Sequence, residues 1–303
     1  MRKFELTILG SNSAMPAYGR FPTSQVLDAN GHLILIDCGE GSQIRMQEYK
    51  VKRSKIKYVL ISHLHGDHVF GLPGFIGSLA HLSRKEPLYI FGPVGIKEYV
   101  ETSLRVSMSY VSFDLVIKEL EYKVPHSIFE DKLITIQCFP VLHRIPTYGY
   151  LIKEVVGDLN IKSDAIASYN LTIAEIKAAK KGEEILRDGQ VIPQEELTYP
   201  RPAPRSYGYC ADSCVAGWSS NHLKGINTLY FETTYLHDMV DLAEERGHAT
   251  AKQAGLLAKE LQVSRLIIGH YSSRYRNVGP LLEEAKAEFD NTVKGYDGLI
   301  INL

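Results

Sequence analysis

The chain has 303 residues, of which 45% are hydrophobic and 23% charged, and its formal net charge is -1 at pH 7. This length and composition allow a full hydrophobic core, as one large domain or two modest ones. The near-zero net charge excludes a molecule that attracts polyanions over its whole surface. No apolar stretch approaches a membrane span, and the N-terminus continues directly into a strand pattern without a secretory signal. We therefore expect a cytoplasmic protein with no membrane attachment.

Short β-prone runs alternate with amphipathic helical runs along most of the chain. The predicted strands lie at residues 4–9, 24–27, 32–36, 58–61, 88–91, 133–139, 148–152, 207–211, 228–231, 266–268 and 299–301. The predicted helices lie at residues 41–49, 71–82, 96–106, 172–181, 250–261 and 280–289. Asn30-Gly31 predicts a tight hairpin turn between the second and third strands. The alternation predicts a layered α/β protein.

One segment departs from this pattern. Residues 156–204 have little strand character: a polar helical piece is followed by glycine turns and a proline-rich end. We interpret the segment as an arm inserted into the core. A surface excursion without function is the alternative.

The cysteines form no Cys-x-x-Cys pair, so neither a disulfide scaffold nor a zinc ribbon is indicated. They are Cys38, Cys138, Cys210 and Cys214. We expect them to be reduced and mostly buried.

The most informative motif is His63-Leu64-His65-Gly66-Asp67-His68, which directly follows the predicted strand 58–61. The chain is expected to leave a buried strand at Ser62 and enter an irregular loop. Residues two apart on an extended segment project to the same side, so His63 and His65 can share one metal ion, while Asp67 and His68 face a second. Two adjacent cations suit a phosphoryl displacement. A histidine-rich surface turn or a single structural metal is the alternative.

Further metal-competent side chains end apolar runs elsewhere in the chain. They are His143, Asp212 and His270. Asp37 also ends such a run, and it could orient a ligand histidine or simply cap a turn. Each residue alone is ordinary, but together with the His63–His68 motif they predict one composite metal site.

The order of these motifs resembles the metal-site motifs of the metallo-β-lactamase superfamily, and more closely those of ribonuclease Z, a family of tRNA 3′-processing endonucleases. The supporting segments are Ser11-Asn12-Ser13-Ala14, Gly71-Leu72-Pro73-Gly74, Gly247-His248-Ala249-Thr250-Ala251 and Ser272-Ser273-Arg274-Tyr275. The resemblance covers nearly the whole chain. It implies a four-layered αβ/βα sandwich, formed as a single domain by residues 1–303, with residues 156–204 as an inserted tRNA-binding arm.

The resemblance also implies roles for individual residues. Two zinc ions per subunit would be bound, one by His63, His65 and His143 and the other by Asp67, His68 and His270, with Asp212 bridging both. Asp67 would also act as general base. His248, held by Glu232, would protonate or stabilise the leaving oxygen. Zinc is favoured by the number of histidines, with manganese or iron as alternatives.

The implied reaction removes the 3′ trailer from precursor tRNA through attack by a hydroxide that the two metals activate. It leaves a tRNA 3′-hydroxyl and a 5′-phosphorylated trailer. The arm would grip the tRNA across a homodimer, and RNA phosphates would contact Lys177, Lys180, Lys181 and Arg274. One alternative is a related metal-dependent phosphodiesterase that acts on small diesters or another RNA. A non-catalytic RNA-binding or metal-binding protein is another.

Two regions differ from the family pattern. The loop after the first strand, residues 16–22, lacks the family's Pro-x-Lys-x-Arg-Asn sequence, so the resemblance carries no expectation about CCA-bearing tRNA. Residues 168–177 replace the Gly-Pro-rich hand of the family arm. The family's detailed tRNA contacts therefore do not transfer to this chain.

Overall fold

The computed structural model describes residues 3–200, 203–215 and 220–303. Residues 201 and 202, which fall within the predicted arm, lie outside the described part. The chain divides into two compact units. The larger comprises Met1–Glu130, Ile134–Lys153 and Arg205–Leu303, and the smaller comprises Asp131–Leu133 and Glu154–Pro204.

The first sheet of the larger unit has seven strands in the order β16-β1-β2-β3-β4-β5-β6. These strands are β1 (Phe4–Gly10), β2 (Ser24–Ala29), β3 (His32–Cys38), β4 (Ile56–Leu60), β5 (Leu88–Pro93), β6 (Leu115–Leu120) and β16 (Ile300–Asn302). The four strands from β3 to β6 run parallel, so their carboxyl ends meet at one edge. Asn30 and Gly31 have φ values of 58° and 95°, as the predicted hairpin turn requires.

The second sheet also has seven strands, in the order β15-β14-β13-β12-β9-β8-β7. They are β7 (His126–Glu130), β8 (Ile134–Val141), β9 (Thr147–Glu154), β12 (Ser206–Cys210), β13 (Thr228–Glu232), β14 (Arg265–Gly269) and β15 (Thr292–Lys294). The strands from β12 to β15 run parallel, and β9 pairs antiparallel with β12. This sheet therefore also gathers carboxyl strand ends at one edge.

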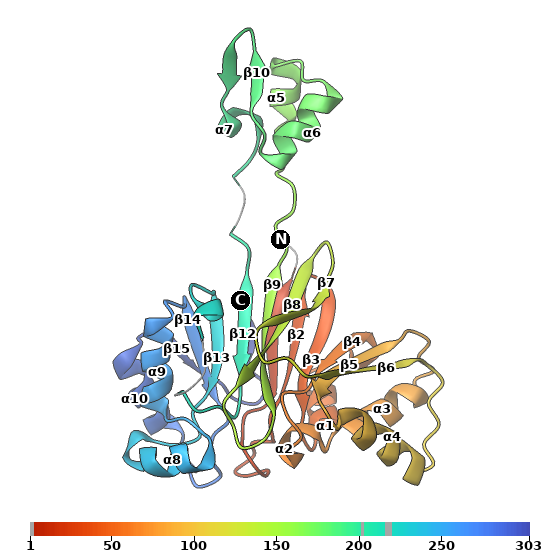
Figure 1. Cartoon of the computed structure of the whole chain (residues 1–303), viewed down its shortest axis with the longest axis vertical. Coiled ribbons are helices and arrows are strands. Elements are labelled where there is room, and N and C mark those ends of the chain that lie inside the picture. The colour runs from red at the N-terminus through yellow and green to blue at the C-terminus, as the bar shows by residue number, and fades with distance from the viewer. Residues whose placement is uncertain (1–2, 201–202, 216–219) are drawn as a thin grey trace. The chain divides into compact units, whose positions relative to one another are not determined.

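Helices cover the outer face of each sheet (Figure 1). On the first sheet they are α1 (Ser42–Glu48), α2 (Gly66–Val69), α3 (Leu72–His81) and α4 (Ile96–Val106), with the short 3-10 helix η1 (Arg53–Lys55). On the second they are α8 (Val240–Arg246), α9 (Ala251–Glu260) and α10 (Gly279–Glu288), with the 3-10 helices η2 (Asn221–Leu223) and η3 (His237–Met239). Helix α9 begins where the sequence predicted, because the Thr250 side chain caps its first turn together with Gln253.

The inner faces of the two sheets contact each other through buried tyrosines of the second sheet. Tyr150 donates a hydrogen bond of 2.6 Å to the Ile61 carbonyl, and Tyr207 donates to Gln25. Separate apolar cores lie between each sheet and its helices. The order helix, sheet, sheet, helix confirms the predicted four-layered sandwich.

The smaller unit has a core of its own. It contains α5 (Ser163–Ser168), α6 (Ile173–Lys181), β10 (Ile185–Arg187), β11 (Gln190–Ile192) and α7 (Gln194–Leu197). Its core side chains are Ala165, Leu171, Ala179, Ile185, Ile192 and Leu197. Its strand content is small, as expected: Asp188 and Gly189 adopt positive φ and close a hairpin between the three-residue strands β10 and β11.

Among the described elements of the larger unit, β6, β7, β15, α2, α8 and the short 3-10 helices were not predicted. Strands β6 and β7 are only partly buried and lack a strict apolar alternation, and β15 has only three residues. The four cysteines are free and buried, as predicted. Among the described residues, no helix combines the length and the apolar character needed to cross a bilayer.

Candidate metal centre

Three predicted site residues lie at carboxyl strand ends and share an unusual backbone conformation. Asp37 is the penultimate residue of β3, Asp212 follows β12 by two residues, and His270 directly follows β14. Their φ values are 53°, 40° and 59°, in the left-handed region that residues other than glycine rarely adopt. Such strained positions cluster at functional sites, where the surrounding structure holds them.

The His63–His68 motif is part loop and part helix. His63 lies in the segment after β4, and His65 has an extended backbone with φ −65° and ψ 147°. The irregular loop predicted to begin at Ser62 is present but short, because Asp67 and His68 lie in the first turn of α2. The change from loop to helix separates the motif into two pairs of side chains.

One cluster gathers three imidazoles. His63 Nε2 lies 2.9 Å from His65 Nδ1, and His143 Nε2 lies 3.3 Å from the same nitrogen. Asp212 Oδ2 lies 3.5 Å from His63 Nε2 and 3.7 Å from His143 Nε2. One ligand atom from each of these four residues falls within 4.8 Å of the others, which suits a single cation.

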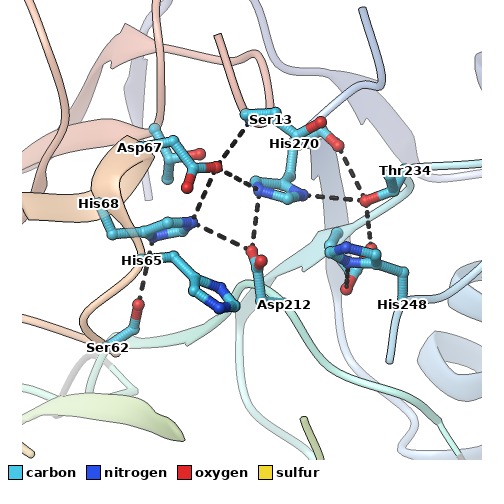
Figure 2. A network of polar contacts seen from close by, with 12 residues as sticks. Ser13, Ser62, His65, Asp67, His68, Asp212, Thr234, His248 and His270 are labelled. Carbon is cyan, nitrogen blue, oxygen red and sulfur yellow. Dashed lines mark hydrogen bonds and ion pairs between the residues drawn. The ribbon is translucent and has the colours of Figure 1, made fainter. Parts of the chain in front are cut away.

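A second cluster lies on the other side of Asp212 (Figure 2). Asp67 Oδ2 lies 3.6 Å from His68 Nε2 and 3.7 Å from His270 Nε2. Asp212 Oδ1 lies 3.1 Å from His68 Nε2 and 2.8 Å from His270 Nε2. The two carboxylate oxygens of Asp212 are thus divided between two groups of ligand atoms.

The buried polar atoms of this centre fit a bound cation. Among the described residues, His68 Nε2, His270 Nε2 and Asp212 Oδ1 are buried and make no hydrogen bond, only the ion-pair contacts given above. Buried polar atoms are nearly always satisfied, and each exception calls for an explanation such as an ion. Imidazole nitrogens and carboxylate oxygens are ligands of zinc and similar divalent metals. The residues present therefore fit metal binding in both clusters.

A network around Asp37 orients the imidazole of His68. His68 Nδ1 lies 2.7 Å from Asp37 Oδ2, to which it donates, so its Nε2 lone pair faces the cluster. Ser62 donates to Asp37 through its backbone nitrogen at 2.7 Å and its hydroxyl at 2.8 Å. Tyr209 donates to the same carboxylate at 2.6 Å. The structure thus places Asp37 behind a candidate ligand; the sequence carried no signal for Ser62 or Tyr209.

A matching network lies behind His270. Thr234 donates its hydroxyl to Glu232 Oε2, and its Oγ1 lies 2.9 Å from His270 Nδ1. A carboxylate cannot donate, so the hydroxyl must accept from His270 Nδ1–H. Glu232 Oε1 lies 3.0 Å from His248 Nδ1 and accepts the Ser213 backbone N–H at 2.6 Å. Thr234, which sequence reasoning missed, thereby links His270 to the Glu232–His248 pair.

His143 is fixed from behind by the backbone. Its Nδ1 lies 2.7 Å from the Gly247 carbonyl, to which it donates. Gly247 has φ 75°, and a Cβ at this position would lie 2.8 Å from His143 Nδ1. Glycine is therefore required immediately before His248.

The charges of the centre perturb its titration in the metal-free protein. Burial lowers the pKa of His270, but Asp212, Asp67 and Glu232 together raise that pKa to about 10. Burial likewise lowers the pKa of His68, and Asp212, Asp37 and Asp67 together raise it well above its usual value. Burial raises the pKa of Asp67, yet His68 opposes this and keeps it below its ordinary range. A bound cation would have to displace the protons on these histidines, so metal affinity must depend on pH.

The neighbouring pair of His248 and Glu232 also has shifted pKa values. Burial lowers the pKa of His248, and the Glu232 carboxylate outweighs that effect and raises it. Burial raises the pKa of Glu232, while His248 lowers it below its ordinary value. The arrangement favours a protonated imidazole paired with a carboxylate.

The predicted RNA-contacting residues lie in different units. Lys177, Lys180 and Lys181 lie on α6 of the smaller unit. Arg274 lies in the larger unit, with its guanidinium carbon 5.3 Å from the ring centroid of Tyr235. The Tyr235 ring is in turn 6.1 Å from that of His248.

Comparisons with known proteins agree with this fold and site. The family model described as the anti-Pycsar protein Apyc1 matches residues 4–197. A ribonuclease Z of Parabacteroides distasonis is 35% identical over 304 residues, covering 100% of both chains. A ribonuclease Z of Cytophaga hutchinsonii is 37% identical and covers 97% of this chain and 95% of its own.

Solved structures share the architecture. The short form of human tRNase Z superposes with a TM-score of 0.73 at 24% sequence identity, covering 98% of each chain. On these matches, the chain belongs to the ribonuclease Z family and, over residues 4–197, to the proteins that the Apyc1 model describes.

Proposed function

We propose that this protein is an endoribonuclease that removes the 3′ trailer from precursor tRNA. The products are a tRNA ending in a 3′-hydroxyl and a trailer with a 5′-phosphate. The observation that carries the proposal is the division of the Asp212 carboxylate, with Oδ2 near His63 and His143 and Oδ1 near His68 and His270. A bridging carboxylate between two ligand clusters suits a two-cation phosphodiester hydrolase.

The residues would hold two zinc ions per subunit. One would be held by His63, His65 and His143, the other by Asp67, His68 and His270, with Asp212 shared between them. Bound there, the ions would acidify a water molecule and offset the charge that develops on the phosphoryl oxygens. Asp67 is ionised and partly exposed, and the Ala14 backbone N–H holds its Oδ2 at 2.7 Å, so it is placed to accept a proton from the attacking water.

His248 supplies the proton for the leaving oxygen. Its Nδ1–H donates to Glu232, which fixes the tautomer and leaves Nε2 to face the substrate. Its ring centroid lies 5.3 Å from that of His143 and 5.6 Å from that of His270, so it borders both clusters. A charged imidazole there can donate to the departing 3′-oxygen of the tRNA.

The smaller unit provides the tRNA-binding arm, with the lysines of α6 on RNA phosphates. On the family pattern the protein works as a cytoplasmic homodimer, in which the arm of one subunit serves the site of the other. The four free, buried cysteines agree with a reducing compartment.

The decisive experiment incubates purified protein with a 3′-extended tRNA and maps the cut at nucleotide resolution. We expect cleavage after the discriminator nucleotide, loss of cleavage by Asp67→Ala, and a kcat reduction of about 10²–10⁴-fold by His248→Ala with zinc content retained. His81→Ala, which changes an exposed histidine on α3, is the matched control and should cleave normally. A chelator should abolish turnover and zinc restore it; turnover without any metal would contradict the proposal.

Deletion of the arm distinguishes the proposed function from the competing one, hydrolysis of small diesters. Replacing residues 156–204 with a short linker should reduce precursor-tRNA cleavage by at least ~10-fold, since phosphate contacts dominate RNA affinity. Hydrolysis of a chromogenic diester should persist. Unchanged activity on both substrates would favour the small-diester function.

A further inference from the structure

A groove of about 730 Å³ opens beside the candidate metal centre, within the larger unit. Its lining includes His143, whose side chain is buried and faces the first ligand cluster, so the groove borders the loop that carries this candidate ligand. We name it the His143 groove and define it by Val94, Leu120, Tyr122, Lys123, Arg144 and Tyr148. Its volume lies in the range typical of sites for small organic groups.

The walls of the His143 groove are apolar and aromatic. The Tyr122 ring stacks on His126, with centroids 3.8 Å apart and planes at 16°, which fixes an aromatic surface at one side. Tyr148 is buried at the base, where its hydroxyl donates to the Leu120 carbonyl at 2.9 Å. Val94 is 55% exposed at the rim. Aromatic surfaces of this kind bind unpaired nucleobases by stacking, with little regard to base identity.

The charge of the groove complements a phosphate backbone. Arg144 and Lys123 are exposed cations, against one lining carboxylate, Glu121. In the part of the chain that the structure describes, neither cation makes a hydrogen bond or ion pair with another residue. The Cγ of Arg144 lies 3.5 Å from the position of a Cβ on Gly247, so its stem packs beside the segment that carries His248. The guanidinium is therefore available to a phosphate next to the site of cleavage.

We propose that the His143 groove binds one unpaired nucleotide of the substrate RNA that flanks the scissile phosphate, with its base against Tyr122 and its phosphate on Arg144. The inference rests on the proposed endoribonuclease function. A nucleotide is favoured over an apolar peptide, because the groove joins an aromatic wall to two unengaged cations and borders the loop of His143, a candidate ligand of a centre suited to a phosphodiester. The groove would thus hold the RNA strand in register for cleavage.

The test combines protein variants with abasic substrates. Precursor tRNAs carry an abasic residue at one of the two nucleotides on either side of the cleavage site, and kcat and KM are measured for the wild type, Tyr122→Ala and Arg144→Ala. Tyr110→Ala and Arg105→Ala, which change exposed residues outside the groove, are matched controls. Tyr122→Phe keeps the ring and should behave as the wild type.

On the normal substrate we expect kcat/KM to fall about fivefold or more in Tyr122→Ala, in line with the contribution of base–aromatic stacking. One abasic position should reduce wild-type kcat/KM by a similar factor and cause no further loss in Tyr122→Ala. Equal abasic losses in both proteins, or wild-type kinetics of both groove variants, would overturn the proposal. Zinc content and circular dichroism identify any variant that fails to fold; if Tyr122→Ala does so, Arg144→Ala and the abasic substrates still test the groove. A wild-type protein that does not cleave precursor tRNA would instead overturn the endoribonuclease function.

Discussion

Replacing Thr234 with valine tests whether the hydroxyl behind His270 supports metal binding and catalysis together. Valine keeps the branched shape of threonine but removes the oxygen. The two hydrogen bonds of that oxygen to side chains are then lost, the one donated to Glu232 and the one accepted from His270 Nδ1–H at 2.9 Å, together with its 3.1 Å contact with the His270 carbonyl. Both partners are buried, so water cannot readily replace the lost hydroxyl.

The expected magnitude follows from these two bonds. A hydrogen bond to a charged group contributes about 1.5–3 kcal/mol, and removal of a residue that orients a metal ligand lowers metal affinity or activity about 10–100-fold. We therefore expect Thr234→Val to weaken zinc binding about 10–100-fold at the cluster containing His270. With zinc in excess, kcat should still be reduced, because Glu232 no longer holds His248 as firmly. A role confined to packing would predict neither effect.

The assay measures zinc affinity by competition with a chelating dye and cleavage of precursor tRNA at saturating zinc. Thr234→Ser, which restores the hydroxyl, should recover most of both quantities. Thr233→Val is the matched control, because this neighbouring buried hydroxyl contacts the Gly269 carbonyl at 3.2 Å and no predicted ligand side chain. It should cost about 1 kcal/mol of stability and leave zinc affinity unchanged. Wild-type zinc affinity and turnover in Thr234→Val would refute the reasoning.

Three further outcomes are expected. The three α6 lysines, Lys177, Lys180 and Lys181, can be changed together to alanine. This triple change should reduce the slope of log KM against log salt concentration by about two to three units, as counterion release predicts. Alanine at the basic residues Lys50, Lys52, Arg53 and Lys55 should leave that slope unchanged. In the presence of a chelator, the protein should lose thermal stability as pH rises from about 6.5 toward 10. The pKa of His270 is raised in the folded protein, so its imidazole stabilises the fold only while it is protonated. With zinc bound, no such loss should occur. Gly255→Ala should reduce the free energy of unfolding by about 1–3 kcal/mol in denaturant titrations, since its Cβ would lie 2.6 Å from the Ala285 carbonyl oxygen and overpack α9 against α10.

Most of the sandwich could be predicted because its strands are buried on both faces and read as short apolar runs. The run Leu33–Ile36 and the run Leu266–Ile268 are examples, and a residue of the candidate site follows each within two positions. An apolar run fixes where a buried strand ends, and a polar residue at its carboxyl end then lies at the edge where parallel strands converge. This is why Asp37 and His270 could be singled out before their contacts were known.

The supporting hydroxyls could not be predicted in the same way. Ser62, Thr234 and Tyr209 act through partners 25, 36 and 172 residues away. Serine and threonine near strand ends commonly cap turns, so their types carry no specific signal. The position of α2 escaped prediction for another reason, because a four-residue helix is too short to show helical periodicity.

The conformation of the strand ends connects the stability of the fold with its chemistry. Asp37, Asp212 and His270 all occupy the left-handed backbone region, at about 1–2 kcal/mol each for residues other than glycine. In the metal-free state the buried Asp212 carboxylate is balanced only by protons on the buried imidazoles of His68 and His270, which adds to the cost. Two sheets with separate apolar cores can bear this cost, and cations bound between the clusters would remove part of it. Metal loading should therefore stabilise the fold by the same contacts that complete the catalytic site, so that a protein without its metals is both inactive and less stable.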